Sequence, residues 1–488
     1  MLKSSAIVWV VTIIGIGVGL AQAKVTALYL GVEGVGVFGQ CLAILALIQL
    51  IVGNAILPAA VRFVALGRAA HDIGQIRRVV ILMRMLVFAV ALLAMVMIIG
   101  FAKPLAQIIF STPAFSHLLI LLAVSLPLTT LATTQRTLLQ AFERIDLWAL
   151  DTLIWSLGGL VLLLVFSATY GLEGAVLHLS VQGLLSVVVA TWLYRRARGA
   201  HAEPLVACVW DTALVRQIMT YNGAAVSVSL AYALTLLGTR SLVIHHAGLA
   251  AGGIYHVVVQ LSLQYLGIAL HSLLAYWSPV IARLQSQSEI SAAINSYTRL
   301  SLFALLPLLM GVIVLREPFV LLVYSSEFAA VQHLLPAQVL ADLLRAAFYP
   351  MFITILLQGR LAPYIGIGLC REAVLFVGAW ALLAHLNVAG VVLATLLANA
   401  GVAVLAYAYV RQAFGFRYTA ANVRLLGASA GAIVLVLGLS SVASLEVSIA
   451  LTMPIGAIWL GLSSTPAERT YVQHYLSQHL APVFSRRN

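Results

Sequence analysis

Residues 24–38 read KVTALYLGVEGVGVF, and residues 240–255 read RSLVIHHAGLAAGGIY. In each stretch a basic residue closes one apolar run, and a glycine-rich segment opens the next. Lys24 and Arg240 are 216 positions apart (240 − 24). This interval predicts that the second stretch is a copy of the first.

Further motifs return in the same order along the chain, at offsets between 213 and 221. One such pair is weak in so apolar a sequence, but an ordered series indicates duplication. Many transporters are built from repeated halves around a cavity near the bilayer midplane. The returning motifs are Pro58-x-x-x-Arg62 with Pro279-x-x-x-Arg283, Phe110-Ser111 with Tyr324-Ser325, Leu138-Leu139-Gln140 with Leu356-Leu357-Gln358, and residues 171–176 with residues 387–392.

The composition places the chain in a membrane. Of its 488 residues, 62% are apolar and 9% are charged, and the mean hydropathy is +1.07. The sequence holds fourteen apolar runs of about 20 residues, which is the length that crosses a bilayer as helix. Barrel strands would instead alternate over about ten residues. We therefore predict an all-α polytopic membrane protein with about 14 transmembrane helices.

The runs group into two pseudo-symmetric six-helix lobes followed by two further helices. Residues 1–198 form the predicted N-terminal lobe, residues 199–214 a cytoplasmic linker, and residues 215–411 the C-terminal lobe. Residues 412–488 hold two extra helices and a cytoplasmic tail, with no partner in the duplication. Six helices per lobe give both copies one orientation, so the predicted pseudo-axis lies along the membrane normal.

The net charge of +12 does not indicate nucleic-acid binding, because the basic residues sort by membrane side. Of the 27 Lys and Arg residues, 22 lie at the termini and the even-numbered connections. Cytoplasmic segments carry the excess of Lys and Arg. This asymmetry predicts that both termini are cytoplasmic. The five on the opposite side are Lys24, Lys103, Arg240, Arg316 and Arg345.

Lys24 and Arg240 are the first candidate site residues. A cation in a spanning segment costs roughly 2.5–3.5 kcal/mol at the bilayer centre, so it usually faces a cavity or a partner. One cation from each wall of a two-lobed cavity suits a pyrophosphate, which Arg binds bidentately and Lys as a point charge. In the alternative, both side chains lie at outer helix ends and extend to the interface.

Two carboxylates within apolar runs are candidates for coupling transport to an ion. Asp342 lies three residues before Arg345, and Glu372 directly follows Arg371. A membrane acid that titrates during transport binds the driving cation. The alternative is mutual neutralisation, in which each acid and its arginine only hide charge.

The remaining polar groups carry weaker indications. Arg62 and Arg283 lie at inner helix ends, where they either anchor to lipid headgroups or contact substrate phosphate at the entry face. His245 and His246 have no third ligand nearby, and three scattered cysteines define no disulfide framework. The sequence contains no Walker motif and no Ser/His/Asp constellation. We expect no metal, no cofactor, and a transporter rather than an enzyme.

A set of motifs spread over about residues 1–411 is similar to one known group of proteins. The motifs are Lys24-x4-Tyr29-Leu30-Gly31-x2-Gly34-x-Gly36, Arg77-Arg78-Val79-Val80, Trp210-Asp211-x2-Leu214-x2-Gln217, Gly253-Ile254-Tyr255, Pro279-x3-Arg283-Leu284, and QVLADLLR at residues 338–345. Together they resemble the Wzx-type O-antigen and common-antigen flippases. That family belongs to the multidrug/oligosaccharidyl-lipid/polysaccharide (MOP) superfamily.

The resemblance implies a bacterial inner-membrane protein with two six-helix lobes around a central cavity. Such a protein flips an undecaprenyl-pyrophosphate-linked oligosaccharide to the outer leaflet, for O-antigen or another surface polysaccharide. A polysaccharide polymerase and a chain-length regulator are the implied partners. The residues that fall on charged positions of the family pattern are Lys24, Arg240, Asp342, Arg345 and Glu372.

Three other functions are compatible with a chain of this kind. A cation-coupled multidrug exporter of the same superfamily would offer carboxylates and aromatic rings to its drugs, whereas inward Lys24 and Arg240 would repel cations. Lipid II flippases also have fourteen helices, and some use the last pair to hold lipid. A membrane glycan polymerase would normally need catalytic acids or histidines on a large outer loop, and the outer connections here are short.

Overall fold

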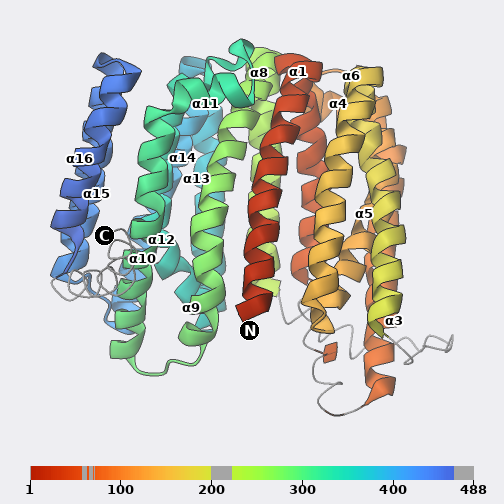
Figure 1. Ribbon diagram of the computed structural model, residues 1–488, viewed down its shortest axis with the longest axis horizontal. Coiled ribbons are helices and arrows are strands. Elements are labelled where there is room, and N and C mark those ends of the chain that lie inside the picture. The colour runs from red at the N-terminus through yellow and green to blue at the C-terminus, as the bar shows by residue number, and fades with distance from the viewer. Residues whose placement is uncertain are drawn as a thin grey trace, which may run out of the picture. The chain divides into compact units, whose positions relative to one another are not determined.

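The computed structural model describes residues 2–55, 57, 63, 64, 70, 72–198 and 223–465, and every regular element in these ranges is helical (Figure 1). The predicted linker, the C-terminal tail beyond residue 465 and Arg62 lie outside them. The elements are α1 (Leu2–Ala55), α3 (Ile73–Gly100), α4 (Ala102–Phe110), η1 (Pro113–Phe115), α5 (Ser116–Ala141), α6 (Ile145–Arg198), α8 (Gly223–Leu266), η2 (Gly267–His271), α9 (Ser272–Ala282), α10 (Gln287–Val314), α11 (Arg316–Val323), η3 (Ser326–Phe328), α12 (Val331–Leu357), α13 (Leu361–Leu386), α14 (Val388–Phe414), α15 (Ala420–Val442) and α16 (Leu445–Ser463).

Eleven of the described helices are long and apolar enough to cross a membrane. Three of them, α1, α6 and α8, are 54, 54 and 44 residues long and each contains one non-helical glycine. A straight helix of 54 residues would extend about 80 Å, far beyond the ~30 Å hydrocarbon core. Each of the three therefore supplies two spans, so that the eleven helices give fourteen, as the sequence predicts.

The backbone repeats its breaks at the interval of the duplication. A positive φ, which favours glycine and then asparagine, recurs at three pairs of positions that are 216 or 217 residues apart. This recurrence confirms the pseudo-symmetric duplication. The pairs are Gly31 (63°) with Gly248 (86°), Glu143 (59°) with Gly359 (72°), and Gly171 (55°) with Asn387 (50°).

The chain folds into two compact units. Unit 1 comprises residues 1–258, 319–331 and 368–394. Within it, α6 packs against both α5 and α1, and α3 packs against α5. Apolar side chains fill the space between these helices, among them Phe38, Cys41, Phe110, Leu122 and Val176. The packed helices hold the polar groups described below at fixed positions.

Unit 2 comprises residues 259–318, 332–367 and 395–488. Its core gathers buried side chains from α10, α12, α15 and α16, including Leu305, Ile433 and Trp459. The indole Nε1 of Trp459 also donates to Ser429 Oγ at 3.1 Å. The two helices that have no partner in the duplication are therefore part of this core.

Arginines fix both ends of that helix pair. Arg299 donates through Nη2 to the Ser463 carbonyl oxygen at 2.6 Å, at the end of α16. Arg316 donates through Nη1 to Ser440 Oγ at 2.8 Å, near the end of α15. Charge-assisted bonds of this kind are stronger than neutral ones, so they hold the end of α16 against α10 and the end of α15 against the start of α11.

Unit 1 includes residues beyond the predicted N-terminal lobe, because part of the second lobe packs against α1. Residues 223–258 of α8 belong to unit 1, where they lie against α1. The lobe boundaries at residues 198 and 215 stay predictions.

The outward surfaces are apolar. Ile13, Leu93, Trp380 and Met453 are between 64% and 76% exposed. Soluble proteins rarely expose so many large apolar side chains together. These surfaces fit a lipid environment, and the chain is a multi-pass membrane protein.

Candidate functional site

Lys24 lies in the first span of α1 and is half-buried. Its ammonium donates to the carbonyl oxygens of Tyr324 at 2.6 Å and Leu321 at 3.4 Å. These carbonyls belong to the C-terminal end of α11, where the last oxygens of a helix lack intrahelical partners. A cation is favourable at that negative end of the helix dipole. Burial also raises the pKa of the Tyr324 phenol, so this side chain stays neutral.

Arg240 lies in the first span of α8 and is only 4% exposed. Its Nη1 donates to the Gly39 carbonyl oxygen on α1 at 2.8 Å. Its Nε is buried, with no hydrogen-bond partner in the described part of the chain. A cation this deeply buried is costly unless it is paired, and here the partner is a neutral carbonyl.

The two cations are not equivalent within the repeat. Gly31 and Gly248 set the local interval at 217, so Lys24 corresponds to Ser241, and Arg240 corresponds to Ala23. A shift of one residue turns a side chain by about 100° around a helix. The sequence interval of 216 placed them at matching positions, whereas the fold gives them different surroundings.

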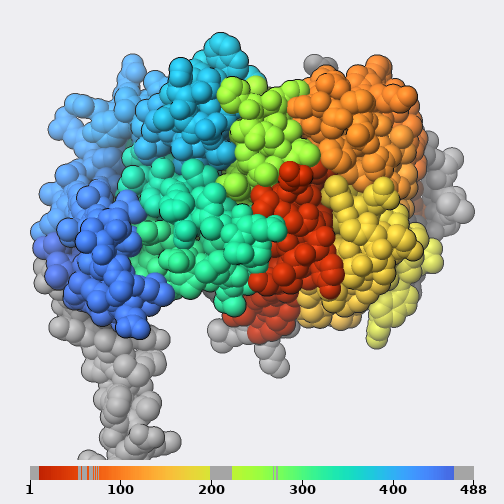
Figure 2. All heavy atoms as spheres, turned by 90° about the horizontal axis from the view of Figure 1, so that it is seen from above, coloured from red at the N-terminus to blue at the C-terminus, as the bar shows by residue number. Residues whose placement is uncertain are grey.

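The second spans of α1 and α8 cross in direct backbone contact. The two helices lie next to each other in Figure 1, and their red and yellow-green surfaces adjoin in Figure 2. A Cβ added to Gly36 would lie 2.5 Å from the Leu249 carbonyl oxygen. A Cβ added to Gly253 would lie well inside 3.0 Å of the Val32 carbonyl oxygen. Both contacts relate positions 217 apart, so the crossing is reciprocal, like an isologous dimer interface.

Polar side chains lie beside this crossing. Gln40 Nε2 donates to Ser241 Oγ at 3.0 Å. The His256 ring lies against Gly39, where a Cβ would meet its Nδ1. Gln40 Oε1 and His256 Nδ1 are buried and unpartnered among the residues described. The crossing therefore combines tight backbone packing with incompletely satisfied polar groups next to Arg240.

Asp342 in unit 2 is fully surrounded by donors. Its Oδ2 accepts from Ser262 Oγ at 2.8 Å and from the Tyr265 hydroxyl, and its Oδ1 accepts from Gln338 Nε2 at 3.1 Å. Arg345 is half-buried and within electrostatic reach. An acceptor with three donors is suited to the ionised carboxylate.

Glu372 in unit 1 has a different environment from Asp342. Its Oε1 binds Arg371 Nη1, whereas its Oε2 is buried without a hydrogen-bond partner among the described residues. Of these two acids, only Glu372 has a carboxylate oxygen that accepts no hydrogen bond from the part of the chain that the structure describes.

The other sequence candidates are placed less tightly. Arg283 is exposed just after α9. His245 Nε2 lies 2.7 Å from the Ile108 carbonyl oxygen, and His246 is exposed. Over the ranges that the structure describes, no three His, Cys, Asp or Glu side chains gather as metal ligands would.

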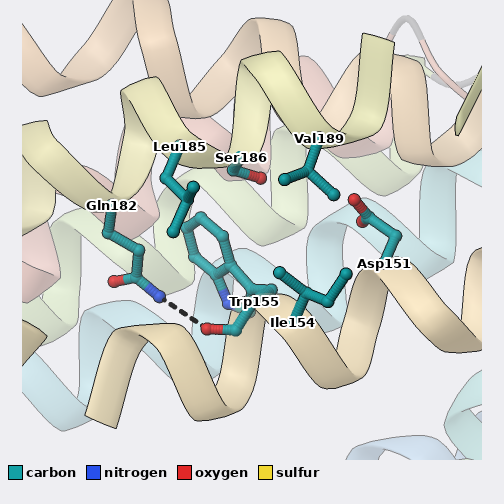
Figure 3. Close-up of a pocket in the computed structure, with 7 residues that line it drawn as sticks. All are labelled: Asp151, Ile154, Trp155, Gln182, Leu185, Ser186 and Val189. Atoms are coloured by element: carbon teal, nitrogen blue, oxygen red, sulfur yellow. Dashed lines mark hydrogen bonds between the residues drawn. The ribbon is translucent and has the colours of Figure 1, made fainter. Parts of the chain in front are cut away.

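A buried ion pair in unit 1 was not identified from the sequence. Asp151, 1% exposed, binds Arg136 Nε, and Arg136 Cζ lies 5.0 Å from the centre of the Trp155 ring. Figure 3 shows Asp151 and Trp155 on the first span of α6, facing Gln182 and Ser186 on the second across a small pocket. The sequence could have indicated this ion pair, because Arg136 and Asp151 are opposite charges within two consecutive apolar runs.

Comparison with known proteins gives the following matches. The model of a family described as "Polysaccharide biosynthesis protein" matches residues 1–285. The chain is 25% identical, over 376 residues, to proteins named "Lipid III flippase" from Escherichia coli (strain K12) and Shigella flexneri. In each case the match covers 77% of this chain and 89% of the relative.

Solved structures show the same fold. A lipid II flippase, MurJ, in an inward closed conformation matches with a TM-score of 0.72 and 12% identity, over 94% of this chain and 98% of that one. An inward-facing multidrug resistance transporter of the MATE family, in the MOP superfamily, matches with a TM-score of 0.70 and 14% identity, over 82% and 94%. At these identities the likeness shows the fold alone.

Proposed function

Because the chain belongs to the polysaccharide biosynthesis protein family, we propose that it flips an undecaprenyl-pyrophosphate-linked oligosaccharide across the bacterial inner membrane. The cargo would serve O-antigen or another surface polysaccharide. The observation that carries the proposal is the deeply buried Arg240 beside the crossing of the two repeats, whose one hydrogen-bond partner among the described residues is a backbone carbonyl. The lipid III flippase relatives support a lipid-linked glycan as cargo.

In the proposed complex, Lys24 and Arg240 donate to phosphate oxygens of the substrate in place of backbone carbonyl oxygens. Lys24 and Arg240 each donate to backbone oxygens, and a pyrophosphate oxygen is a stronger acceptor than a neutral carbonyl. The substrate would replace these partners during alternating access, while the prenyl tail stays in lipid. Arg62 and Arg283 are the proposed phosphate contacts at the entry face. A polymerase and a chain-length regulator are proposed to receive the flipped product.

Purified protein in liposomes tests this function. An undecaprenyl-diphosphate oligosaccharide with a fluorescent sugar should become accessible to a quencher in the outer leaflet only when the protein is present. A second arm uses lipid II, because the likeness to the lipid II flippase covers 94% of this chain. A third arm uses a cationic dye, as a multidrug exporter would require. Movement of the dye without either lipid-linked substrate would overturn the proposal.

Coupling to an ion gradient is proposed to involve Asp342 or Glu372, with Arg345 as the neighbour of Asp342. Each acid is buried within a membrane span, where acids mark ion pathways. Asp342→Asn and Glu372→Gln should each block gradient-driven flipping in liposomes while substrate binding survives. Undiminished gradient dependence in both variants would place the coupling site elsewhere and leave these acids structural.

The proposed orientation has both termini in the cytoplasm, from the distribution of Lys and Arg. Reporter domains fused after Arg198 and after Asn488 should be active only in the cytoplasm. A reporter inserted next to His246 should be active only outside it. The reverse pattern would invert the proposed orientation.

A further inference from the structure

Two short helices occupy corresponding places in the two repeats. α4 connects α3 with α5, and α11 connects α10 with α12. The motifs Phe110-Ser111 and Tyr324-Ser325, 214 positions apart (324 − 110), follow the same pattern at their ends. By the order of spans along the chain, both helices lie at the same membrane face as the turns at Gly31 and Gly248, which is the outer face in the proposed orientation.

The end of each short helix is capped by a side chain from the other repeat. Lys24, in the first span of α1, donates to the Leu321 and Tyr324 carbonyl oxygens at the end of α11. His245, in the first span of α8, donates through Nε2 to the Ile108 carbonyl oxygen at the end of α4, at 2.7 Å. We name these contacts the α11 cap and the α4 cap.

The donors of the two caps lie on the same face of equivalent spans. Lys24 precedes its turn at Gly31 by seven residues, and His245 precedes its turn at Gly248 by three. The difference is four residues, which is close to one helical turn. The two caps are therefore related by the repeat, and each ties a helix of one repeat to a span of the other.

The two caps differ in charge. The Lys24 ammonium brings a cation to the end of α11, where a positive charge is favourable, whereas the His245 imidazole can donate to α4 without a charge. Lys24 is also a cation of the proposed diphosphate site. Only the α11 cap therefore uses a residue that the substrate would bind.

A diphosphate and the end of α11 compete for Lys24. The last carbonyl oxygens of α11 form the negative end of the helix dipole. Glu327, in η3, adds a carboxylate nearby, since a Cβ added to Gly31 of α1 would lie 3.5 Å from its Oε2. Like charges repel at short range, so a diphosphate bound to Lys24 is driven away from the end of α11.

We propose that the lipid diphosphate opens the α11 cap by binding Lys24, while the α4 cap stays closed. The inference rests on the proposed function and assigns to its site a control of the transport cycle. In addition to the crossing at Gly36 and Gly253, the α11 cap holds the second repeat to α1 at the outer face. Its release by substrate allows this face to open when the site is loaded and hinders an empty cycle.

Amide hydrogen exchange in the detergent-solubilised protein measures both caps, because an uncapped helix end opens more often. The Tyr324 amide, which donates to the Val320 carbonyl oxygen at 2.9 Å, reports on the last turn of α11. Saturating undecaprenyl diphosphate should speed exchange there by about tenfold to a hundredfold, the effect of one charge-assisted contact. Exchange at the end of α4 should not change.

Two alanine variants should act across the repeats. Lys24→Ala should give fast exchange at the end of α11 without ligand, and saturating diphosphate should add nothing. His245→Ala is the matched control. It should speed exchange at the end of α4 by about twofold to tenfold, the loss of a neutral hydrogen bond, and keep the response of α11 to the diphosphate. A purely local perturbation would instead change exchange in α1 or α8 alone.

The outcomes separate the inference from the function on which it rests. If the wild type binds the diphosphate and exchange at the end of α11 stays slow, the cap is only structural and the inference is wrong, while the flippase proposal stands. Fast exchange with phosphatidylglycerol would also overturn the inference, because any anionic headgroup would then open the cap. If the wild type binds no prenyl diphosphate, the proposed function itself is wrong and the inference fails with it.

Discussion

Replacing Lys24 and Arg240 together by alanine is expected to abolish surface glycan export in a cell that depends on this protein, at normal membrane levels. Each lost charge-assisted contact should weaken binding roughly tenfold to a hundredfold. Arg240→Ala should be the more damaging single change, because Arg240 is 4% exposed and Lys24 is half-buried. Surface glycan blotting and binding of undecaprenyl diphosphate are the measurements.

Conservative replacements refine this expectation. Lys24→Arg should keep most activity, because a point charge suffices at that position. Arg240→Lys should lose more, because an ammonium lacks the planar fork with which a guanidinium binds two phosphate oxygens. Lys103→Ala is the control, since Lys103 lies on the same predicted side of the membrane and is exposed. Full export by the double alanine variant would show that neither cation is needed to bind the substrate.

Enlarging either glycine of the α1–α8 crossing is expected to be the most damaging change to the fold. Gly36→Leu and Gly253→Leu place a side chain where a backbone carbonyl lies within 3.0 Å of the new Cβ. Backbone cannot move aside as a flexible side chain can, so overpacking of about 1–3 kcal/mol or more should result. Both variants should show a lower thermal unfolding temperature and little export.

The control for the crossing lies in the same helix. A Cβ at Gly15 of α1 would meet nothing within 4 Å, so Gly15→Leu should leave the unfolding temperature and export near wild type. Because the two contacts are reciprocal, Gly36→Leu and Gly253→Leu should have similar effects. A crossing variant as stable and active as Gly15→Leu would contradict the packing.

The fold was predictable because lipid imposes a strong pattern. Apolar runs of span length recur fourteen times, and turn residues such as Gly31 and Gly248 recur at the repeat interval. That Lys24 and Arg240 do not occupy equivalent positions of the repeat was not predictable from the sequence. A shift of one residue is within the uncertainty of motif matching, yet it turns a side chain by about 100°.

The partners of the charged residues were harder to predict than their positions. The sequence shows that Asp342 precedes Arg345 by one turn, but not that Ser262 and Tyr265 of a distant segment donate to Asp342. The sequence shows Arg371 only as the neighbour of Glu372. Its electrostatic interaction with Tyr255 depends on how α8 and α13 pack. Sequence spacing reports contacts along one helix, whereas these contacts form between helices.

The turns at Gly31, Gly171, Gly248 and Asn387 limit how the molecule can deform. Each joins two spans through a single residue outside helical geometry, so only two backbone dihedrals separate one helix from the next. A connection of one residue cannot lengthen, so a displacement of one span must move the neighbouring span as well. The spans joined in this way should travel as pairs, which leaves the transport cycle with fewer independent moving parts than spans.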